Sequence, residues 1–196
     1  MDPARVRLCG LVLAAGAGRR FGGPKALARG ADGAPWVARA VDALVKGGCD
    51  RVVVALSPAS AAAAALVPAP ATSVVVGDAA RGLAATLRGA LAAAVPADGV
   101  VILPVDTPDV VPGAVRRVIA EGGRPLRQAL AQAVYRGRPG HPVLVGADHV
   151  AALRATLRGD EGARAYLRAA AARQVECGDL WSGDDIDERG GAHLGS

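Results

Sequence analysis

The sequence predicts an α/β fold in which a sheet rich in valine is covered by helices on its faces. Short apolar runs alternate with helical stretches along most of the 196 residues, a pattern typical of such sheets. Apolar residues make up 52% of the chain and charged residues 21%, which allows a sizeable core and excludes disorder as the main state. Since no repeat or long linker divides the chain, we expect a single domain over residues 1–196.

The elements follow from local patterns. Residues 6–13 are nearly continuous in hydrophobic side chains, which predicts a strand covered on both faces. A glycine-rich loop at residues 16–23 follows, and residues 35–46 then predict a helix, because proline suits a first turn and two glycines come after its end. The remaining predictions are strands at 51–56, 73–76, 100–103, 129–135, 142–145 and 173–177, and helices at 59–67, 82–94, 112–121, 149–158 and 161–171.

The helices of the second half carry individual signals. Leucines at every fourth position, from Leu83 onward, mark the helix at 82–94. Gly159 predicts the end of one helix, and Asp160 is a candidate N-cap for the next. Asp109 is similarly expected to cap the helix at 112–121.

The charge balance argues against a nucleic-acid partner. Lys and Arg number 23 against 18 Asp and Glu, which gives a net charge of +5, and the basic residues are spread along the chain. A polyanion-binding protein usually concentrates them in a stripe, and the few aromatic residues offer no stacking platform for single strands.

Membrane and export signals are also missing from the sequence pattern. Residues 52–77 are uncharged and long enough to span a bilayer, but three prolines favour a strand, turn, helix and strand instead. Charged residues interrupt the apolar start of the chain, so no signal peptide is expected. Three cysteines without Cys-x-x-Cys spacing predict buried free thiols. We therefore expect a cytoplasmic protein without a membrane partner.

The segment after the first strand predicts a cradle for phosphate groups. Its small residues let the backbone approach a ligand with free amide N–H groups, and Arg19, Arg20 and Lys25 add cations. Two common phosphate loops do not fit. Phe21 stands where a dinucleotide fingerprint needs glycine, and Pro24 separates the last glycine from Lys25, unlike a Walker-type loop.

Two groups of carboxylates are candidate metal ligands. Asp106 follows a predicted buried strand, at the strand end where open α/β sheets bind ligands, and Mg²⁺ prefers such hard oxygen ligands. In extended backbone Asp185 and Asp187 project to the same side and could clamp a cation. An acidic patch near a C-terminus is equally typical of a solvated tail, so the residues alone leave this group open.

Several segments resemble the MobA-like nucleotidyltransferases in the same chain order. The signature L-A-A-G-x-x-x-R-F-G-x-P-K is matched by Leu13-Ala14-Ala15-Gly16, Arg20-Phe21-Gly22 and Pro24-Lys25. Its Ala-Ala-Gly form is more similar to the molybdenum cofactor cytidylyltransferase branch. Later matches are Gly82-Leu83-Ala84-Ala85-Thr86-Leu87-Arg88, Gly140-His141-Pro142 and Asp185-Ile186-Asp187. The resemblance implies a Rossmann-like, three-layer α/β/α nucleotide-diphospho-sugar transferase fold with a mostly parallel mixed sheet.

The resemblance also implies roles for residues. Arg20, Lys25 and Asp106 are expected to be catalytic, while Asp106, Asp185 and Asp187 hold Mg²⁺. The expected nucleotide-binding residues are Leu13, Ala14, Ala15, Gly16, Ala17, Gly18, Arg20, Lys25, Gly82, Thr86 and Arg88. His141 borders the acceptor pocket. The chain departs from the pattern after Asp187, where Glu188-Arg189 replaces the usual Thr-Pro, and at Ala84 and Ala85, where serines are usual.

The function implied is transfer of a nucleoside monophosphate, CMP from CTP, onto the phosphate of the molybdenum cofactor with release of pyrophosphate. A molybdoenzyme or its chaperone would be the protein partner. Four alternatives stay open: GTP as donor, a sugar phosphate or another small phosphate-bearing acceptor, a regulatory nucleotide-binding module without turnover, and a nicotinamide-dependent oxidoreductase. Phe21 and the lack of an acidic residue at Leu56-Ser57 weaken the oxidoreductase.

Overall fold

The computed structural model describes residues 7–159 and 162–187, and their strands form one seven-stranded sheet. The strand order is β3-β2-β1-β4-β6-β5-β7. The strands are β1 (Leu8–Leu13), β2 (Arg51–Leu56), β3 (Thr72–Val75), β4 (Gly99–Pro104), β5 (Leu130–Tyr135), β6 (Arg138–Gly146) and β7 (Arg173–Glu176). β6 runs antiparallel to both of its neighbours, and the other strand pairs are parallel. The prediction of a mostly parallel mixed sheet is therefore confirmed.

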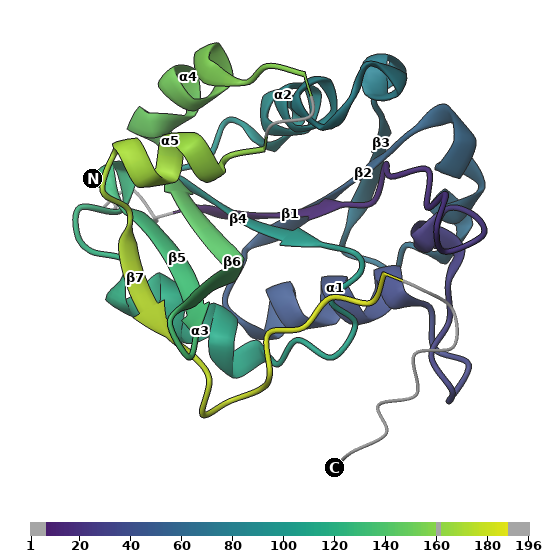
Figure 1. Cartoon of the computed structure of the whole chain (residues 1–196), viewed down its shortest axis with the longest axis horizontal. Helices are drawn as coiled ribbons and strands as arrows, with labels where there is room; N and C mark the ends of the chain where they lie inside the picture. Colours follow the sequence, from purple (N-terminus) through teal and green to yellow (C-terminus); the bar gives the residue numbers. More distant parts are fainter. Residues whose placement is uncertain (1–6, 160–161, 188–196) are drawn as a thin grey trace.

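Helices cover both faces of this sheet (Figure 1). The α-helices are α1 (Trp36–Lys46), α2 (Leu83–Ala94), α3 (Pro112–Glu121), α4 (Ala147–Thr156) and α5 (Arg164–Ala169), and the 3-10 helices are η1 (Lys25–Leu27), η2 (Pro58–Leu66), η3 (Gly77–Arg81) and η4 (Leu126–Gln128). α1 and α3 lie on one face, and α2, α4 and α5 on the other. This is the expected three-layer α/β/α arrangement.

The central strand β1 is buried from both sides, as its sequence predicts. Leu8 and Val12 belong to the apolar cluster that includes the buried side chains of α1 and α3. Cys9 and Leu11, which alternate with them, belong to the cluster on the α2, α4 and α5 face. The sheet is thus held between two separate apolar layers.

Most elements lie within a few residues of their predicted bounds, and the helix predicted at 59–67 is a 3-10 helix over residues 58–66. Three details differ. β6 begins at Arg138, in the interval between the predicted strands at 129–135 and 142–145, because positive φ values at Arg136 and Gly137 close a tight hairpin. The helix predicted at 161–171 spans only α5, and Asp160 lies outside the described residues. Asp109 does not cap α3, since it instead accepts a hydrogen bond from Arg39 at 3.3 Å.

The chain path creates a crevice at one edge of the sheet. β1 pairs with β2 on one side and with β4 on the other. Leu13, the last residue of β1, lies opposite Ala55 and Pro104. The segments that follow β1 and β4 therefore leave the sheet side by side, at the point where the strand order reverses. Ligands bind at such points in open α/β sheets.

Two further expectations concern thiols and membranes. Cys9, Cys49 and Cys177 are free and buried, as predicted. Burial raises the pKa of the Cys49 thiol to about 12, aided by Cys9 and Asp50, so this group stays protonated. In the part of the chain that the structure describes, no helix has the length and apolar character needed to cross a bilayer.

Candidate active site

The glycine-rich loop takes a shape that depends on glycine. Gly18 has a φ of +59°, and the amide of Gly23 donates a hydrogen bond to its carbonyl oxygen at 3.0 Å. A Cβ atom on Gly18 would lie only 1.8 Å from the carbonyl oxygen of Gly23. Phe21 is buried against Trp36 of α1, with ring centroids 5.2 Å apart. The loop is thus closed on itself and packed onto a helix.

The start of this segment is fixed from the neighbouring strand and helix. The amide of Ala14 donates to the carbonyl of Ala55 at 2.9 Å. The carbonyl of Ala14 accepts a hydrogen bond from the buried Ser60 hydroxyl at 3.1 Å. Ser60 also forms a capping box with Ser57 at the start of η2. Two serines therefore hold the base of the glycine-rich loop in place.

A cleft of about 1590 Å³ opens beside the loop, between the edge of the sheet and the elements around it. The predicted site residues that line it are Leu13, Ala15, Gly16, Ala17, Gly18, Arg20, Lys25, Gly82, Thr86, Asp106, His141, Asp185 and Asp187. Ala14 and Arg88 do not line it. The guanidinium of Arg88 donates to the carbonyl oxygen of Leu157 at 2.8 Å, and Ala14 is buried. Ala14 and Arg88 are thus the two predicted nucleotide-binding residues that the fold does not bring to the cleft lining.

Three carboxylates from distant parts of the chain meet at the cleft. One carboxylate oxygen from each of Asp106, Asp185 and Asp187 lies within 4.8 Å of the others. A set made only of hard oxygen donors suits a divalent cation such as Mg²⁺ or Mn²⁺, and does not resemble the nitrogen and sulfur ligands of structural zinc. The residues present thus fit the cation that the sequence predicts.

Lys25 lies against two of these carboxylates. Its Nζ donates to Asp106 Oδ2 and to Asp187 Oδ1, both at 2.9 Å, and its side chain is 12% exposed. Burial acts to lower the pKa of Lys25, but the hydrogen bonds to Asp187 and Asp106 outweigh it and raise the pKa above its usual value. The same contacts lower the pKa of Asp187. Lys25 therefore carries a positive charge, and its hydrogen bonds to Asp106 and Asp187 keep that charge beside the cluster.

Arg20 and His141 complete the charged groups of the cleft. An Nη atom of Arg20 lies 3.9 Å from Asp187 Oδ2, but the side chain is 78% exposed, so the pair is weak and the guanidinium can reach a ligand. Burial lowers the pKa of His141, although Asp106 and Asp185 act to raise it. His141 is therefore a neutral imidazole at pH 7, able to exchange hydrogen bonds with a substrate.

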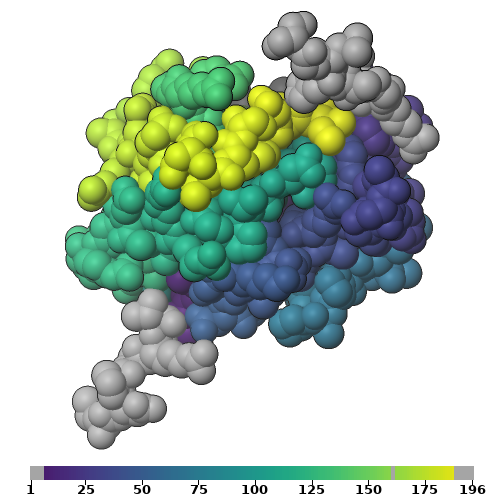
Figure 2. All heavy atoms as spheres, turned by 90° about the horizontal axis from the view of Figure 1, so that it is seen from below, coloured from purple at the N-terminus to yellow at the C-terminus, as the bar shows by residue number. Residues whose placement is uncertain are grey.

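Residues 177–187, here named the C-terminal strap, deliver two of the carboxylates. Figure 1 shows the strap leaving β7 and passing α3 and α1. In Figure 2 the strap, in yellow, lies across the surface and runs toward a part of the chain drawn in purple and dark blue. Near its start Arg117 holds Asp179 through two hydrogen bonds. Near its end the amide of Ile186 donates to the carbonyl of Asp106 at 2.9 Å. Glu188 and Arg189, where the family pattern is broken, lie outside the described residues.

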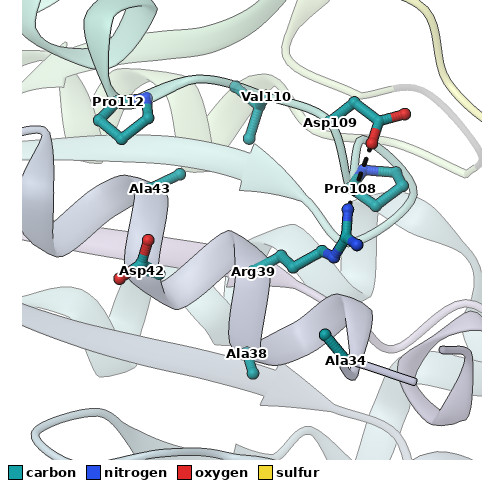
Figure 3. A pocket seen from close by; sticks show the side chains of 9 residues that line it. All are labelled: Ala34, Ala38, Arg39, Asp42, Ala43, Pro108, Asp109, Val110 and Pro112. Carbon is teal, nitrogen blue, oxygen red and sulfur yellow. Dashed lines mark hydrogen bonds and ion pairs between the residues drawn. The ribbon is translucent and has the colours of Figure 1, made fainter. Parts of the chain in front are cut away.

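A smaller hollow of about 490 Å³ lies between α1 and the segment that follows β4 (Figure 3). Arg39 extends across it to Asp109 and also contacts Asp32 at 2.8 Å. None of the predicted site residues lines this hollow. Its ion pairs link α1 to the segment that carries Asp106, and the larger cleft remains the candidate site.

Sequence reasoning missed the residues that hold the site together. Ser57 and Ser60 carry a readable signal, because serine three residues after a potential N-cap beside proline is typical of a helix start. Tyr135 and Trp181, which join the end of β5 to the strap, carry no local signal. Their hydrogen bond joins a strand end to a distant segment without regular structure.

Comparisons with known proteins agree with the geometry. A family model described as a MobA-like NTP transferase domain matches residues 10–175. A relative named nicotine blue oxidoreductase, from Paenarthrobacter nicotinovorans, is 33% identical over 189 residues, which cover 91% of each chain.

Several solved structures are also similar to this chain. Rv0371c of Mycobacterium tuberculosis H37Rv is 30% identical, with a TM-score of 0.79 over 93% of each chain. Its complex with manganese is 29% identical, with a TM-score of 0.69 over 88% of each chain. A nucleotidyl transferase from Methanothermobacter, 21% identical with a TM-score of 0.74 over 93% of this chain and 92% of its own, shares the fold. With the family model spanning most of its length and these relatives covering nearly all of it, the chain belongs to the MobA-like NTP transferase family of nucleotidyltransferases.

Proposed function

We propose that this nucleotidyltransferase moves CMP from CTP onto the phosphate of the molybdenum cofactor, with Mg²⁺ as its metal, and releases pyrophosphate. One observation carries the proposal. The carboxylates of Asp106, Asp185 and Asp187 converge within 4.8 Å beside Lys25, in the same cleft as the glycine-rich loop. A triphosphate and a divalent cation require such an arrangement of backbone donors, mobile cations and hard oxygen ligands.

The residues that line the cleft indicate which end of it would hold the nucleotide. The backbone of Gly16, Ala17 and Gly18 would meet the phosphates, with Arg20 and Lys25 adding charge. Leu13 and Ala15 would lie against the ribose and base. Gly82 and Thr86 line the same end, where the hydroxyl of Thr86 donates to the carbonyl of Gly82 at 3.3 Å. The nucleotide would thus lie between β1 and α2.

Transfer needs one new bond and one broken bond. An oxygen of the acceptor phosphate forms a bond to the α-phosphorus, and the bond from that phosphorus to the oxygen bridging the α- and β-phosphates breaks, so its electron pair leaves with pyrophosphate. The acceptor phosphate is already ionised at neutral pH, and no strong general base is required. A divalent cation held by Asp106, Asp185 and Asp187 would neutralise charge on the phosphates. Lys25 and Arg20 would align them and add positive charge.

Two features support the finer assignments. The Ala-Ala-Gly sequence at residues 14–16 favours the cytidylyltransferase branch. A relative with 29% identity has been solved in complex with manganese, and the all-carboxylate donor set suits both Mn²⁺ and Mg²⁺.

A pyrophosphate-release screen tests the function directly. Each of the four NTPs is combined with Mg²⁺ and with molybdenum cofactor, a sugar phosphate or no acceptor. We expect release only with CTP and the cofactor. Release with GTP, or with the sugar phosphate, would replace the donor or the acceptor in the proposal. Binding of NTP without any release would identify a non-catalytic nucleotide-binding module.

Asp106→Asn provides the site control in this screen. Loss of one carboxylate charge at the cluster should lower turnover by orders of magnitude, at least about a hundredfold, with the far-UV spectrum unchanged. Asp109→Asn, the same change in the same segment but outside the cleft, should retain most of the activity. Wild-type turnover by Asp106→Asn at saturating Mg²⁺ would remove Asp106 from the metal role.

The name of one relative favours a second candidate, an oxidoreductase. The nicotine blue oxidoreductase shares 33% identity over nearly the whole chain. Against it, Leu56-Ser57 at the end of β2 offers no carboxylate for a ribose hydroxyl, and the side chain of Ser57 is committed to capping η2. Nicotine blue is incubated with NADH or NADPH and the absorbance of the reduced cofactor is followed. Oxidation of the reduced cofactor in this assay, together with no pyrophosphate release in the NTP screen, would favour the oxidoreductase.

A further inference from the structure

Tyr135, at the end of β5, connects the two sides of the candidate site. Its side chain is buried, with the residue 2% exposed. The hydroxyl donates a hydrogen bond to the carbonyl oxygen of His141, on the acceptor side of the cleft. The same hydroxyl accepts a hydrogen bond from the indole Nε1 of Trp181, in the C-terminal strap, at 2.7 Å. Both hydrogen-bonding capacities of the buried hydroxyl are therefore used.

The ring of Tyr135 is enclosed by backbone that approaches too closely for side chains. A Cβ atom on Gly140 of β6 would lie 2.8 Å from the ring, and one on Gly183 of the strap would lie 2.3 Å from it. The Trp181 ring meets it edge-on, with centroids 5.3 Å apart and an interplanar angle of 77°. Tyr135 is thus packed between a strand of the sheet and the strap.

The carboxylate-bearing end of the strap is held by individual contacts, among them the hydrogen bond from Lys25 to Asp187 at 2.9 Å. Residues 181–187 belong to no helix or strand. Arg138 lies 3.5 Å from Asp184, but its side chain is 71% exposed, so this ion pair adds little. The amide of Ile186 donates to the carbonyl of Asp106. Asp185 and Asp187 are therefore positioned jointly by these contacts and by the anchoring that precedes them, at Trp181 and Gly183.

We propose that Tyr135 is a positioning residue for the metal site: through its hydrogen bond to Trp181 it fixes the strap so that Asp185 and Asp187 meet Asp106. The inference rests on the proposed function, since it takes these three carboxylates as the cation ligands. Tyr135 does not line the cleft and is not a catalytic residue. Its effect is on how completely the ligand set is assembled before a cation arrives.

Removal of the Tyr135 hydroxyl should weaken binding of the cation. Tyr135→Phe keeps the ring and its packing but leaves the indole N–H of Trp181 and the carbonyl of His141 without this partner, which disfavours the docked strap. The apparent affinity for a cation falls with the fraction of molecules in which the ligand set is complete. We expect the dissociation constant for Mn²⁺ to rise about tenfold. Turnover at saturating metal and nucleotide should change less than twofold, because the reacting groups are untouched.

The experiment measures binding of Mn²⁺ alone to the purified full chain, by the loss of its EPR signal, and then turnover as a function of metal concentration. Tyr166→Phe is the matched control. It removes a hydroxyl that is hydrogen-bonded to His149 at 2.8 Å, away from the strap. Asp106→Asn removes one of the proposed ligands, and so shows whether the measured Mn²⁺ binding takes place at the proposed site. We expect weaker Mn²⁺ binding for Tyr135→Phe and wild-type binding for Tyr166→Phe.

The outcomes separate the two proposals. Equal Mn²⁺ affinity of the wild type and Tyr135→Phe would overturn the role of Tyr135 and leave the metal site standing. Wild-type protein that binds no Mn²⁺, or binds it equally well after Asp106→Asn, would overturn the metal site and this inference with it. An equal loss of affinity in Tyr166→Phe would show a general effect on packing, and would also overturn the inference.

A second variant covers the case in which Tyr135→Phe does not fold. Trp181→Phe removes the donor of the same hydrogen bond from the strap side. It should weaken Mn²⁺ binding by a similar factor while the His141 contact stays in place. In the double variant the loss should be smaller than the product of the two single losses, because both changes break one interaction. Wild-type affinity in Trp181→Phe, or multiplied losses in the double variant, would contradict the inference.

Discussion

At the residue scale, Lys25 connects the proposed nucleotide and metal halves of the site. Its ammonium group lies 2.9 Å from carboxylate oxygens of both Asp106 and Asp187. Without such a charge, the three carboxylates of the cluster would repel one another. A divalent cation bound to the same oxygens would compete with the ammonium group, which could then turn to a nucleotide phosphate. One lysine can thus serve the cluster first and the triphosphate afterwards.

This competition makes a testable prediction for Lys25→Met. Removal of the ammonium group should tighten binding of Mn²⁺ alone by about tenfold or more, since unit charges about 4 Å apart interact by about 4 kcal/mol near a protein surface. The same variant should bind NTP more weakly and transfer more slowly. Titrations of Mn²⁺ and of NTP measure the two effects separately.

Lys46→Met is the matched control, because it makes the same charge change at an exposed lysine that pairs with Asp42. It should alter neither titration. If Lys25→Met bound Mn²⁺ more weakly than the wild type, the competition would be excluded.

The sequence predicted these residues because their chemistry is local. Lys25 and Asp106 each follow a buried strand within a recognisable motif, and both line the cleft. Arg88 lies in a motif as well, yet its guanidinium contacts Leu157 of a distant segment. A motif fixes which side chains are available, whereas the direction of a long side chain depends on the partners that the fold places near it.

At the element scale, the glycine-rich loop depends on backbone conformation more than on side chains. Gly18→Ala should raise the KM for NTP severalfold, because a Cβ atom would overlap the carbonyl of Gly23 and the positive φ disfavours alanine. Gly77→Ala is the comparison, since that position has an open surrounding and an ordinary φ. Steady-state kinetics would check both. An unchanged KM for Gly18→Ala would show that the loop shape does not matter for the nucleotide.

The junction between β7 and the strap predicts a pH dependence of stability. Hydrogen bonds from the amides of Gly178 and Arg136 lower the pKa of Glu176 below its usual value of 4.5. A lowered pKa means that the stabilisation is present above the unfolded-state pKa and is lost as the pH falls through the folded-state value.

Glu176→Gln should therefore lower the melting temperature slightly at pH 7, and the difference from the wild type should vanish below the folded-state pKa of Glu176. Thermal melts between pH 7 and pH 3 would measure it. A difference of the same size at every pH would show that the charge of Glu176 plays no part.

The elements themselves could be predicted well where the apolar period is clear. β2 and α3 have the predicted bounds, and β1 differs only at its start. The helix predicted at 59–67 is a 3-10 helix over residues 58–66. The prediction did not specify the helix type, because an alanine-rich run favours either type and its period does not distinguish them. Two residues of left-handed backbone at Arg136 and Gly137 turned a predicted loop into part of a hairpin.

At the scale of the whole molecule, the proposed metal ligands exist as a set only in the folded chain. Asp106 follows β4, whereas Asp185 and Asp187 belong to the strap beyond β7. A cation that binds this set therefore binds the folded state alone, and should stabilise it by about 2.7 kcal/mol at a concentration one hundred times its dissociation constant.

Saturating Mn²⁺ should accordingly raise the melting temperature by several degrees, and an excess of EDTA should reverse the rise. Asp106→Asn should show little of it. Differential scanning fluorimetry measures all three conditions. A wild-type melting temperature that does not change with Mn²⁺ would contradict assembly of the site on folding.

The sequence by itself determined the α/β class, most strand and helix positions, the glycine-rich loop and the family, because each of these is written in short segments of chain. It also named Asp106, Asp185 and Asp187, but left open whether the last two form a site or a solvated tail. Only the tertiary structure shows that the three carboxylates lie together, with one oxygen of each within 4.8 Å of the others. The strap reaches Asp106 through contacts between distant segments: Trp181 donates to Tyr135, the backbone at Gly183 packs closely on the tyrosine ring, and Ile186 donates to the carbonyl of Asp106. Such contacts have no local pattern from which they could be predicted.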